Sequence, residues 1–179
     1  MTRISPEQFR SAFLQVTSAA QPECLAHWDF KPDLTAQMET LYTGLEPLLG
    51  LKAHAEYNKL DCVYYAECDT EHFGTPSYYA TCLGVVVEHE NNIGGSAEEM
   101  NKLQMLNTPL KVLITYADSE AQRNLHLGRY AKIVSSADIF GDFATLRRQL
   151  VIFGSRDDCK AYWHFYVYEE GGFRELQVA

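Results

Sequence analysis

The chain has 179 residues, of which 46% are hydrophobic and 22% are charged, and its formal net charge is −9. This composition is typical of a globular α/β protein with a substantial core, and we expect one domain spanning residues 1–179. The negative net charge argues against a protein whose whole surface binds nucleic acid. No apolar run of about 18 residues predicts a membrane span, and the N-terminus lacks the apolar segment of a signal peptide. We therefore expect a cytoplasmic protein with no membrane partner.

The five cysteines are scattered and form no Cys-x-x-Cys pair, so reduced thiols packed as small apolar groups explain them best. The six histidines also lack the spacing of metal ligands. Neither residue type predicts a metal centre.

Two helices are predicted at the start of the chain. Ser5-Pro6-Glu7 begins the first, because proline is favoured just inside a helix N-terminus. Asp33 is the expected N-cap of the second, which carries leucines at helical spacing and ends at Gly50. We expect residues 21–31 to connect the two helices.

Strands and helices then alternate. Strands are predicted over 51–56, 60–66, 78–90, 110–116, 150–154, 161–168 and 173–178. Ser96 and Glu99 have the spacing of a capping box that begins a helix, and residues 119–149 are typical of an interrupted helix. The order strand, helix, strand predicts a parallel crossover, so we expect an α/β fold with a central mixed β-sheet flanked by helices.

An acidic cluster is predicted at one end of this sheet. Glu88 and Glu90 end the strand 78–90 and point to one face, whereas His89 points to the other. If the strands 60–66 and 78–90 fold about Gly74-Thr75, Asp61 lies directly opposite Glu88, with Cβ atoms roughly 5 Å apart. Carboxylates this close repel, and a hard divalent cation is the simplest compensation. A solvated rim of acids without a metal remains the alternative.

An acid that opens one strand, Glu-x-Glu at the end of the next, then a helix and the buried strand Leu-Lys-Val-Leu-Ile-Thr-Tyr, resembles the PD-(D/E)xK nuclease superfamily. The resemblance covers about Leu51 to Tyr116 and implies a restriction-endonuclease-like fold. It implies that Asp61 and Glu88 hold Mg²⁺ (or Mn²⁺), and that Glu90 is a third ligand or deprotonates water. The usual motif has lysine where this chain has Glu90, and no proline precedes Asp61.

Lys102, on the helix that follows, is a candidate replacement for the missing lysine. The alternative is a surface ion pair with Glu98 four residues earlier, which helical geometry favours. Glu99 lies nearer the sheet, but the capping box alone explains it. Glu39 of the second predicted helix is a further acid that could approach the site, as an acid there does in some members of the superfamily.

The resulting hypothesis is a metal-dependent endonuclease that hydrolyses phosphodiester bonds in nucleic acid, with DNA as the expected partner. Its candidate catalytic residues are Asp61, Glu88, Glu90 and Lys102. The rival is a catalytically inactive member of the same fold that acts as an interaction or regulatory module, which the net charge and the absent motif lysine favour. The sequence leaves open whether the protein forms a homodimer, although cutting two strands would require two sites.

Overall fold

The predicted strands pair into a central sheet in the computed structural model, which describes residues 3–26, 31–71, 79–143, 145–157 and 160–176. The helices are α1 (Pro6–Ala26), α2 (Lys31–Leu49), α3 (Ser96–Gln104) and α4 (Glu120–Ala137). The strands are β1 (Lys52–Tyr57), β2 (Leu60–Tyr65), β3 (Thr70–Glu71), β4 (Tyr79–Ala80), β5 (Val85–Glu90), β6 (Leu110–Tyr116), β7 (Arg148–Asp157), β8 (Lys160–Glu169) and β9 (Gly172–Glu175). None of the described helices is long and apolar enough to cross a membrane.

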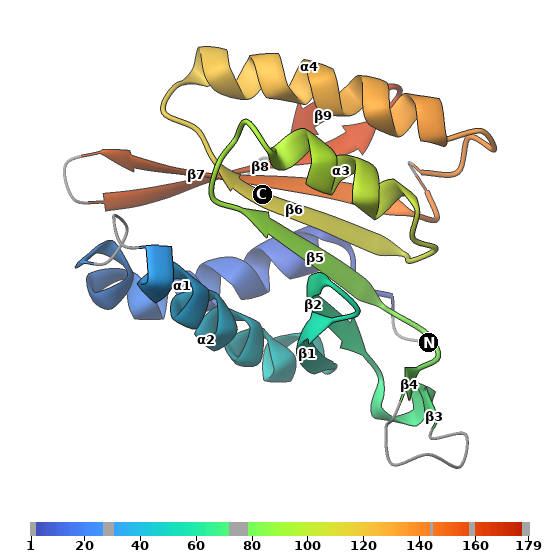
Figure 1. Ribbon diagram of the computed structural model, residues 1–179, viewed down its shortest axis with the longest axis horizontal. Helices are drawn as coiled ribbons and strands as arrows, with labels where there is room; N and C mark the ends of the chain where they lie inside the picture. Colours follow the sequence, from blue (N-terminus) through green and yellow to red (C-terminus); the bar gives the residue numbers. More distant parts are fainter. Residues whose placement is uncertain (1–2, 27–30, 72–78, 144, 158–159, 177–179) are drawn as a thin grey trace.

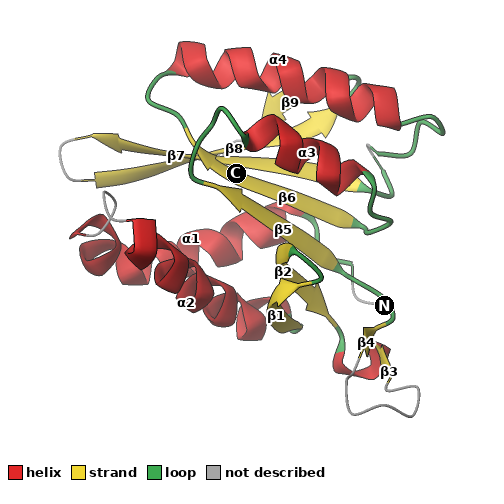
Figure 2. Cartoon of the chain, in the orientation of Figure 1, coloured by secondary structure: helices red, strands yellow, loops and turns green. Residues whose placement is uncertain are grey.

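The sheet is mixed and has seven strands in the order β1-β2-β5-β6-β7-β8-β9. β5, β6 and β7 are parallel to one another, and the remaining neighbours are antiparallel. α1 and α2 cover one face of the sheet, and α3 and α4 cover the other (Figures 1 and 2). The fold is therefore α/β with a central mixed sheet flanked by helices, as predicted.

Each face of the sheet has its own hydrophobic core because side chains alternate along a strand. On β5, Val85 and Val87 pack beneath α1 and α2, whereas Val86 packs beneath α3 and α4. β5 and β6 lie in the middle of the sheet, with helices on both faces. This explains the apolar start of β5, Val85 to Val87, and the mostly apolar sequence of β6. A charged residue on either strand is therefore buried, and its stability depends on whether it has a partner.

Three predicted boundaries were wrong. α1 continues to Ala26, so residues 21–26 are helical and not a connection. α2 begins at Lys31, so Asp33 lies inside it. The predicted strand 78–90 is divided, because β4 leaves the main sheet to pair with β3 and only β5 pairs with β2.

The predicted capping box was also wrong. Gly95 is the N-cap residue of α3, and no side chain caps the helix. The Ser96 hydroxyl instead contacts the carbonyl oxygen of Ile93 and the hydroxyl of Tyr130. The Glu99 carboxylate is therefore not needed at the helix start.

Candidate functional site

The predicted register between β2 and β5 is confirmed. Cys62 lies opposite Val87, and continuing this antiparallel register by one residue puts Asp61 opposite Glu88. The predicted turn itself, Gly74-Thr75, lies outside the described residues. The strand pairing thus brings together the first two acids of the predicted cluster.

Glu88 is a buried acid that faces α3, and its side chain is only 1% exposed. The ammonium group of Lys102 meets it, with Nζ 2.9 Å from Oε1 of Glu88 and 2.7 Å from Oε2 of Glu99. The same Nζ donates a hydrogen bond of 3.0 Å to the carbonyl oxygen of Lys59. Oxygens from β5, α3 and the β1–β2 turn therefore surround one cation.

The lysine thus takes partners that the sequence did not favour. The spacing along the helix favoured Glu98, which is exposed, whereas the structure pairs Lys102 with Glu99 and Glu88. Lys102 is close enough to the sheet to take part in chemistry there. It also compensates the buried charge of Glu88, so a bound metal is not the only way to make this acid tolerable.

Asp61 lies beside Glu88 and is held by the main chain. Its Oδ2 accepts a hydrogen bond of 2.6 Å from the backbone N–H of His89. The two carboxyl groups are close enough for each to influence the pKa of the other. The backbone of β5 thus fixes the direction of the Asp61 carboxylate.

Burial dominates the ionisation of both acids. It raises the pKa of Asp61, although the His89 N–H and the Lys102 charge oppose this rise. It also raises the pKa of Glu88, with the neighbouring Asp61 adding to the rise and Lys102 opposing it. For Lys102, burial lowers the pKa, but the Glu99 and Glu88 carboxylates outweigh it and the net shift is upward. Lys102 is consequently a cation, not a base, at neutral pH.

His89 points to the opposite face, as predicted. Its Nε2 lies 2.9 Å from the hydroxyl of Tyr116, and burial lowers the pKa of the ring to about 4. The imidazole is therefore neutral at physiological pH. Its contribution to the site is the backbone N–H that orients Asp61.

Glu90, the third predicted acid, has different partners. Its Oε1 accepts a hydrogen bond of 2.7 Å from the backbone N–H of Asn92. A Cβ atom on Gly95 would lie 2.9 Å from Glu90 Oε2, so a larger residue at this position would require the Glu90 side chain to shift. The Glu90 carboxylate thus holds the loop between β5 and α3.

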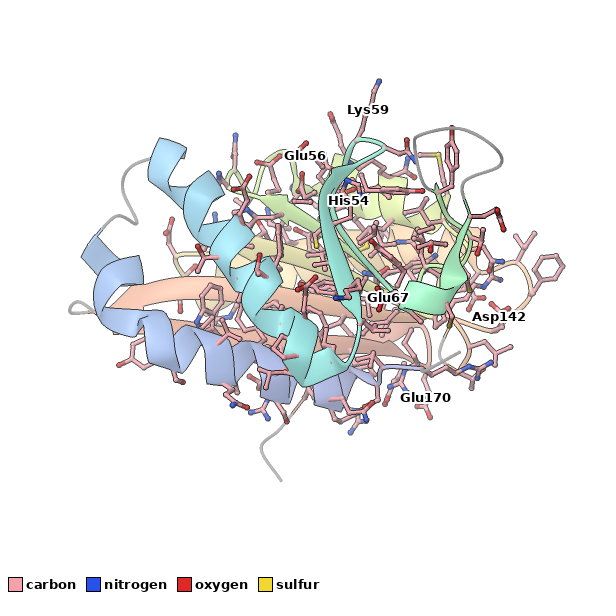
Figure 3. The ribbon with its side chains drawn as sticks, turned by 90° about the horizontal axis from the view of Figure 1, so that it is seen from below. His54, Glu56, Lys59, Glu67, Asp142 and Glu170 are labelled. Carbon is pink, nitrogen blue, oxygen red and sulfur yellow. The ribbon has the colours of Figure 1, made fainter. Side chains whose placement is uncertain are left out.

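A small polar cavity of about 120 Å³ adjoins Asp61 on the α2 side of the sheet. Its walls include Glu39, Tyr42, Glu56, Asp61 and His89. Figure 3 shows this side of the molecule, with Glu56 and Lys59 close together where β1 turns into β2. Glu39, which the sequence analysis considered, therefore shares this cavity with Asp61, and Glu56 adds an acid that the sequence did not single out.

The Asp61–Glu88 pair has the donor atoms that a hard cation prefers. Both Glu88 carboxylate oxygens are buried. Oε1 is engaged by the Lys102 ammonium, and Oε2 has no hydrogen-bond partner within the described residues. Oε2 thus retains coordinating capacity. Among the described residues, no group of three or more His, Cys, Asp and Glu side chains is arranged to hold a metal. Two carboxylates suit Mg²⁺, which usually takes its remaining ligands from water and substrate phosphates.

Two partners of Lys102 were not predicted: the Glu99 carboxylate, which the sequence analysis assigned to the capping box, and the Lys59 carbonyl oxygen. The first carried a signal, because Glu99 precedes Lys102 by three residues on a helix, a spacing at which opposite charges meet. The second carried no signal, since a backbone oxygen has no sequence signature.

The chain matches no family model and none of the curated proteins with which it was compared.

Proposed function

We propose that this protein is a metal-dependent nuclease of the PD-(D/E)xK type, with a restriction-endonuclease-like fold, that hydrolyses phosphodiester bonds in nucleic acid, with DNA as the expected substrate. The observation that carries the proposal is the convergence of Asp61, Glu88 and Lys102 at one end of the sheet. Two acids and a lysine are the residue types of the superfamily motif. The lysine comes from α3 and not from β5.

Asp61 and Glu88 would hold Mg²⁺ or Mn²⁺. When bound, the metal would lower the pKa of a coordinated water and neutralise charge on the scissile phosphate. The His89 N–H fixes the orientation of the Asp61 carboxylate, which would be one of the ligands. Preorganised ligands of this kind cost no rearrangement during the reaction.

Lys102 would supply positive charge next to the reacting phosphate. Its ammonium is 2.9 Å from Glu88, so a phosphate bound at the acidic pair would meet it directly. A fixed cation stabilises the charge that develops in a phosphoryl transition state. The Glu90 carboxylate, which accepts from Asn92, would hold the loop at the edge of the site and act less directly.

The test is cleavage of end-labelled single-stranded DNA, double-stranded DNA and RNA, with and without Mg²⁺ or Mn²⁺. Wild type should cleave only with metal, and Glu88→Gln and Lys102→Met should each lose roughly 100-fold or more in rate. Glu98→Gln, an exposed neighbour of the site on α3, is the matched control and should keep its rate. Equal rates in wild type and Glu88→Gln would contradict the proposal.

A second candidate is a catalytically inactive interaction module on the same fold. The ion pair between Lys102 and Glu88 favours it, because the buried acid is already compensated without a metal. The net charge of −9 also disfavours broad contact with nucleic acid. Folded wild type that cleaves none of the substrates under any metal condition would support this candidate.

A further inference from the structure

Lys102 occupies the position of a counter-ion in the acidic pair. Three oxygens lie within 3.0 Å of its Nζ, from Glu88, Glu99 and the Lys59 carbonyl. Only the first of these belongs to the proposed metal site. A divalent cation that coordinates Glu88 would bring a second positive charge next to the ammonium, and the two cations would repel.

The other two partners of Lys102 lie outside the metal site. Glu99 and Lys102 are both on α3, three residues apart, so the helix keeps them together whatever Glu88 does. The Lys59 carbonyl belongs to the turn before β2. The side chain of Lys59 itself points away from the molecule (Figure 3). These two acceptors can retain the ammonium beside the site after it leaves Glu88.

We propose that Lys102 is a resident counter-ion that a divalent cation displaces from Glu88, and that Glu99 is the positioning residue that retains the displaced lysine at the site. This inference rests on the proposed metal site. In this arrangement Lys102 neutralises the buried Glu88 carboxylate before the metal binds. After the metal binds, Lys102 is available to contact a phosphate. Metal and lysine thus compete for one carboxylate.

The first experiment measures Mn²⁺ binding by titration calorimetry, without nucleic acid, in wild type, Lys102→Met and the control Lys132→Met. Lys132 lies on α4 and is exposed, so the control removes one positive charge away from the site. We expect Lys102→Met to bind Mn²⁺ at least roughly fivefold more tightly than wild type, at the lower end of usual coupling between two ligands. Lys132→Met should bind as wild type does.

The outcomes separate this inference from the proposed function. If wild type binds Mn²⁺ and Lys102→Met binds it equally or more weakly, the counter-ion role is overturned and the metal site stands. If only Lys102→Met binds, the counter-ion role is supported and the metal-dependent function of wild type is contradicted. If neither binds, both are overturned.

The role of Glu99 is tested by a double-mutant cycle with the same Mn²⁺ titration. Glu99→Gln should weaken Mn²⁺ binding, because Lys102 then has only Glu88 as an anionic partner and holds it more firmly. In the Lys102→Met background the same substitution should have little effect, and Glu98→Gln should have little effect in either. An equal loss in both backgrounds would show that Glu99 acts on the ion itself and would overturn its retaining role.

A measurement on the wild-type chain covers the case in which Lys102→Met folds poorly. Lysine acetylation by an amine-reactive ester is followed by mass spectrometry with and without saturating Mn²⁺. Acetylation of Lys102 should become faster with Mn²⁺, since the ammonium loses one of its partners, whereas acetylation of Lys132 should not change. An unchanged or slower rate at Lys102 would contradict the displacement.

Discussion

Two buried charged residues on the same face of the sheet, Glu88 and Lys111, have different partners. Glu88 of β5 meets the ammonium of Lys102 and lies beside a second acid. Lys111 of β6 is also fully buried, but its Nζ forms no hydrogen bond within the described residues and lies 4.5 Å from the ring centroid of Phe143. Figure 3 shows Lys59, whose carbonyl oxygen accepts a hydrogen bond from Lys102, well apart from Asp142, which precedes Phe143 in the chain.

The loop after α4 explains why Lys111 is enclosed. The guanidinium of Arg147 lies on the same ring as Lys111, 4.7 Å from its centroid, and Asp142 holds that guanidinium through two hydrogen bonds. Burial, helped by Arg147, lowers the pKa of Lys111 to about 8. An aromatic face offsets only part of the cost of burying a cation. The contrast is that Glu88 is buried against an opposite charge, whereas Lys111 is buried against an aromatic ring.

The largest expected effect is on activity, and it distinguishes the surroundings of Glu88 from those of Lys111 most sharply. Asp61→Asn and Glu88→Gln should each reduce metal-dependent cleavage by roughly 100-fold or more, because both remove a ligand charge. Lys111→Met should change the rate less than about threefold. Initial rates on the preferred substrate, with circular dichroism to confirm folding, measure this. A comparable loss in Lys111→Met would remove the functional distinction.

The next effect concerns stability. Lys102→Met should destabilise the protein by about 1–3 kcal/mol, since it leaves a buried acid without its cation. Lys111→Met should be neutral or stabilising by about 1 kcal/mol, since an apolar side chain of similar length replaces an unpaired buried ammonium. Urea unfolding of both variants gives the free energies. Destabilisation of Lys111→Met by more than about 2 kcal/mol would indicate that the Lys111 charge is structurally required.

The pH dependence of stability should have opposite slopes for the two charges. The pKa of Glu88 is raised on folding above its ordinary value of 4.5, so its contribution to stability is complete below pH 4.5 and is lost as pH rises. The pKa of Lys111 falls from 10.5 to about 8, so unfolded chains bind the extra proton between these values and stability rises with pH there.

Urea unfolding across this range tests the slopes. Glu88→Gln should flatten the fall of the unfolding free energy below pH 8. Lys111→Met should flatten its rise above pH 8. The difference curve between each variant and wild type isolates its own group from all others. A Lys111→Met difference curve that is flat from pH 8 to 10.5 would contradict the lowered pKa.

The smallest effect is the contact between Lys111 and Phe143. A double-mutant cycle with Lys111→Met and Phe143→Leu should give a coupling energy of about 0.5–1 kcal/mol at neutral pH. The coupling should disappear above pH 10, where the amine is neutral in the folded protein. A coupling that persists there would indicate ordinary packing and not an interaction of the cation with the ring.

The sequence predicted the parts of the site that depend on strand geometry. Asp61 opposite Glu88 follows from the period of a strand and a symmetric fold of the chain between them. The partner of Lys102 does not follow, because a flexible four-carbon side chain reaches several acids and the choice depends on how α3 packs on the sheet. Met100 and Leu103 fix that packing by lying in the core, and this leaves Lys102 within reach of Glu88.

Other differences have local causes that the pattern of residue types does not reveal. The Glu90 carboxylate was expected beside Glu88 by strand parity, but the backbone N–H of Asn92 offers it a hydrogen bond in the loop. The predicted capping box failed because the Ser96 hydroxyl contacts Ile93 and Tyr130. Lys111 stood within an apolar strand in the sequence, yet its partner Phe143 comes from a distant loop and only tertiary structure reveals the contact.

The most direct measurement for the central claim is a crystal structure of the protein soaked with Mn²⁺, with anomalous scattering used to locate the ion. We predict an anomalous peak between the carboxylates of Asp61 and Glu88, with the Lys102 ammonium still near Glu99 but withdrawn from Glu88. A structure at saturating Mn²⁺ with no peak at this pair, and with Lys102 still in contact with Glu88, would contradict it.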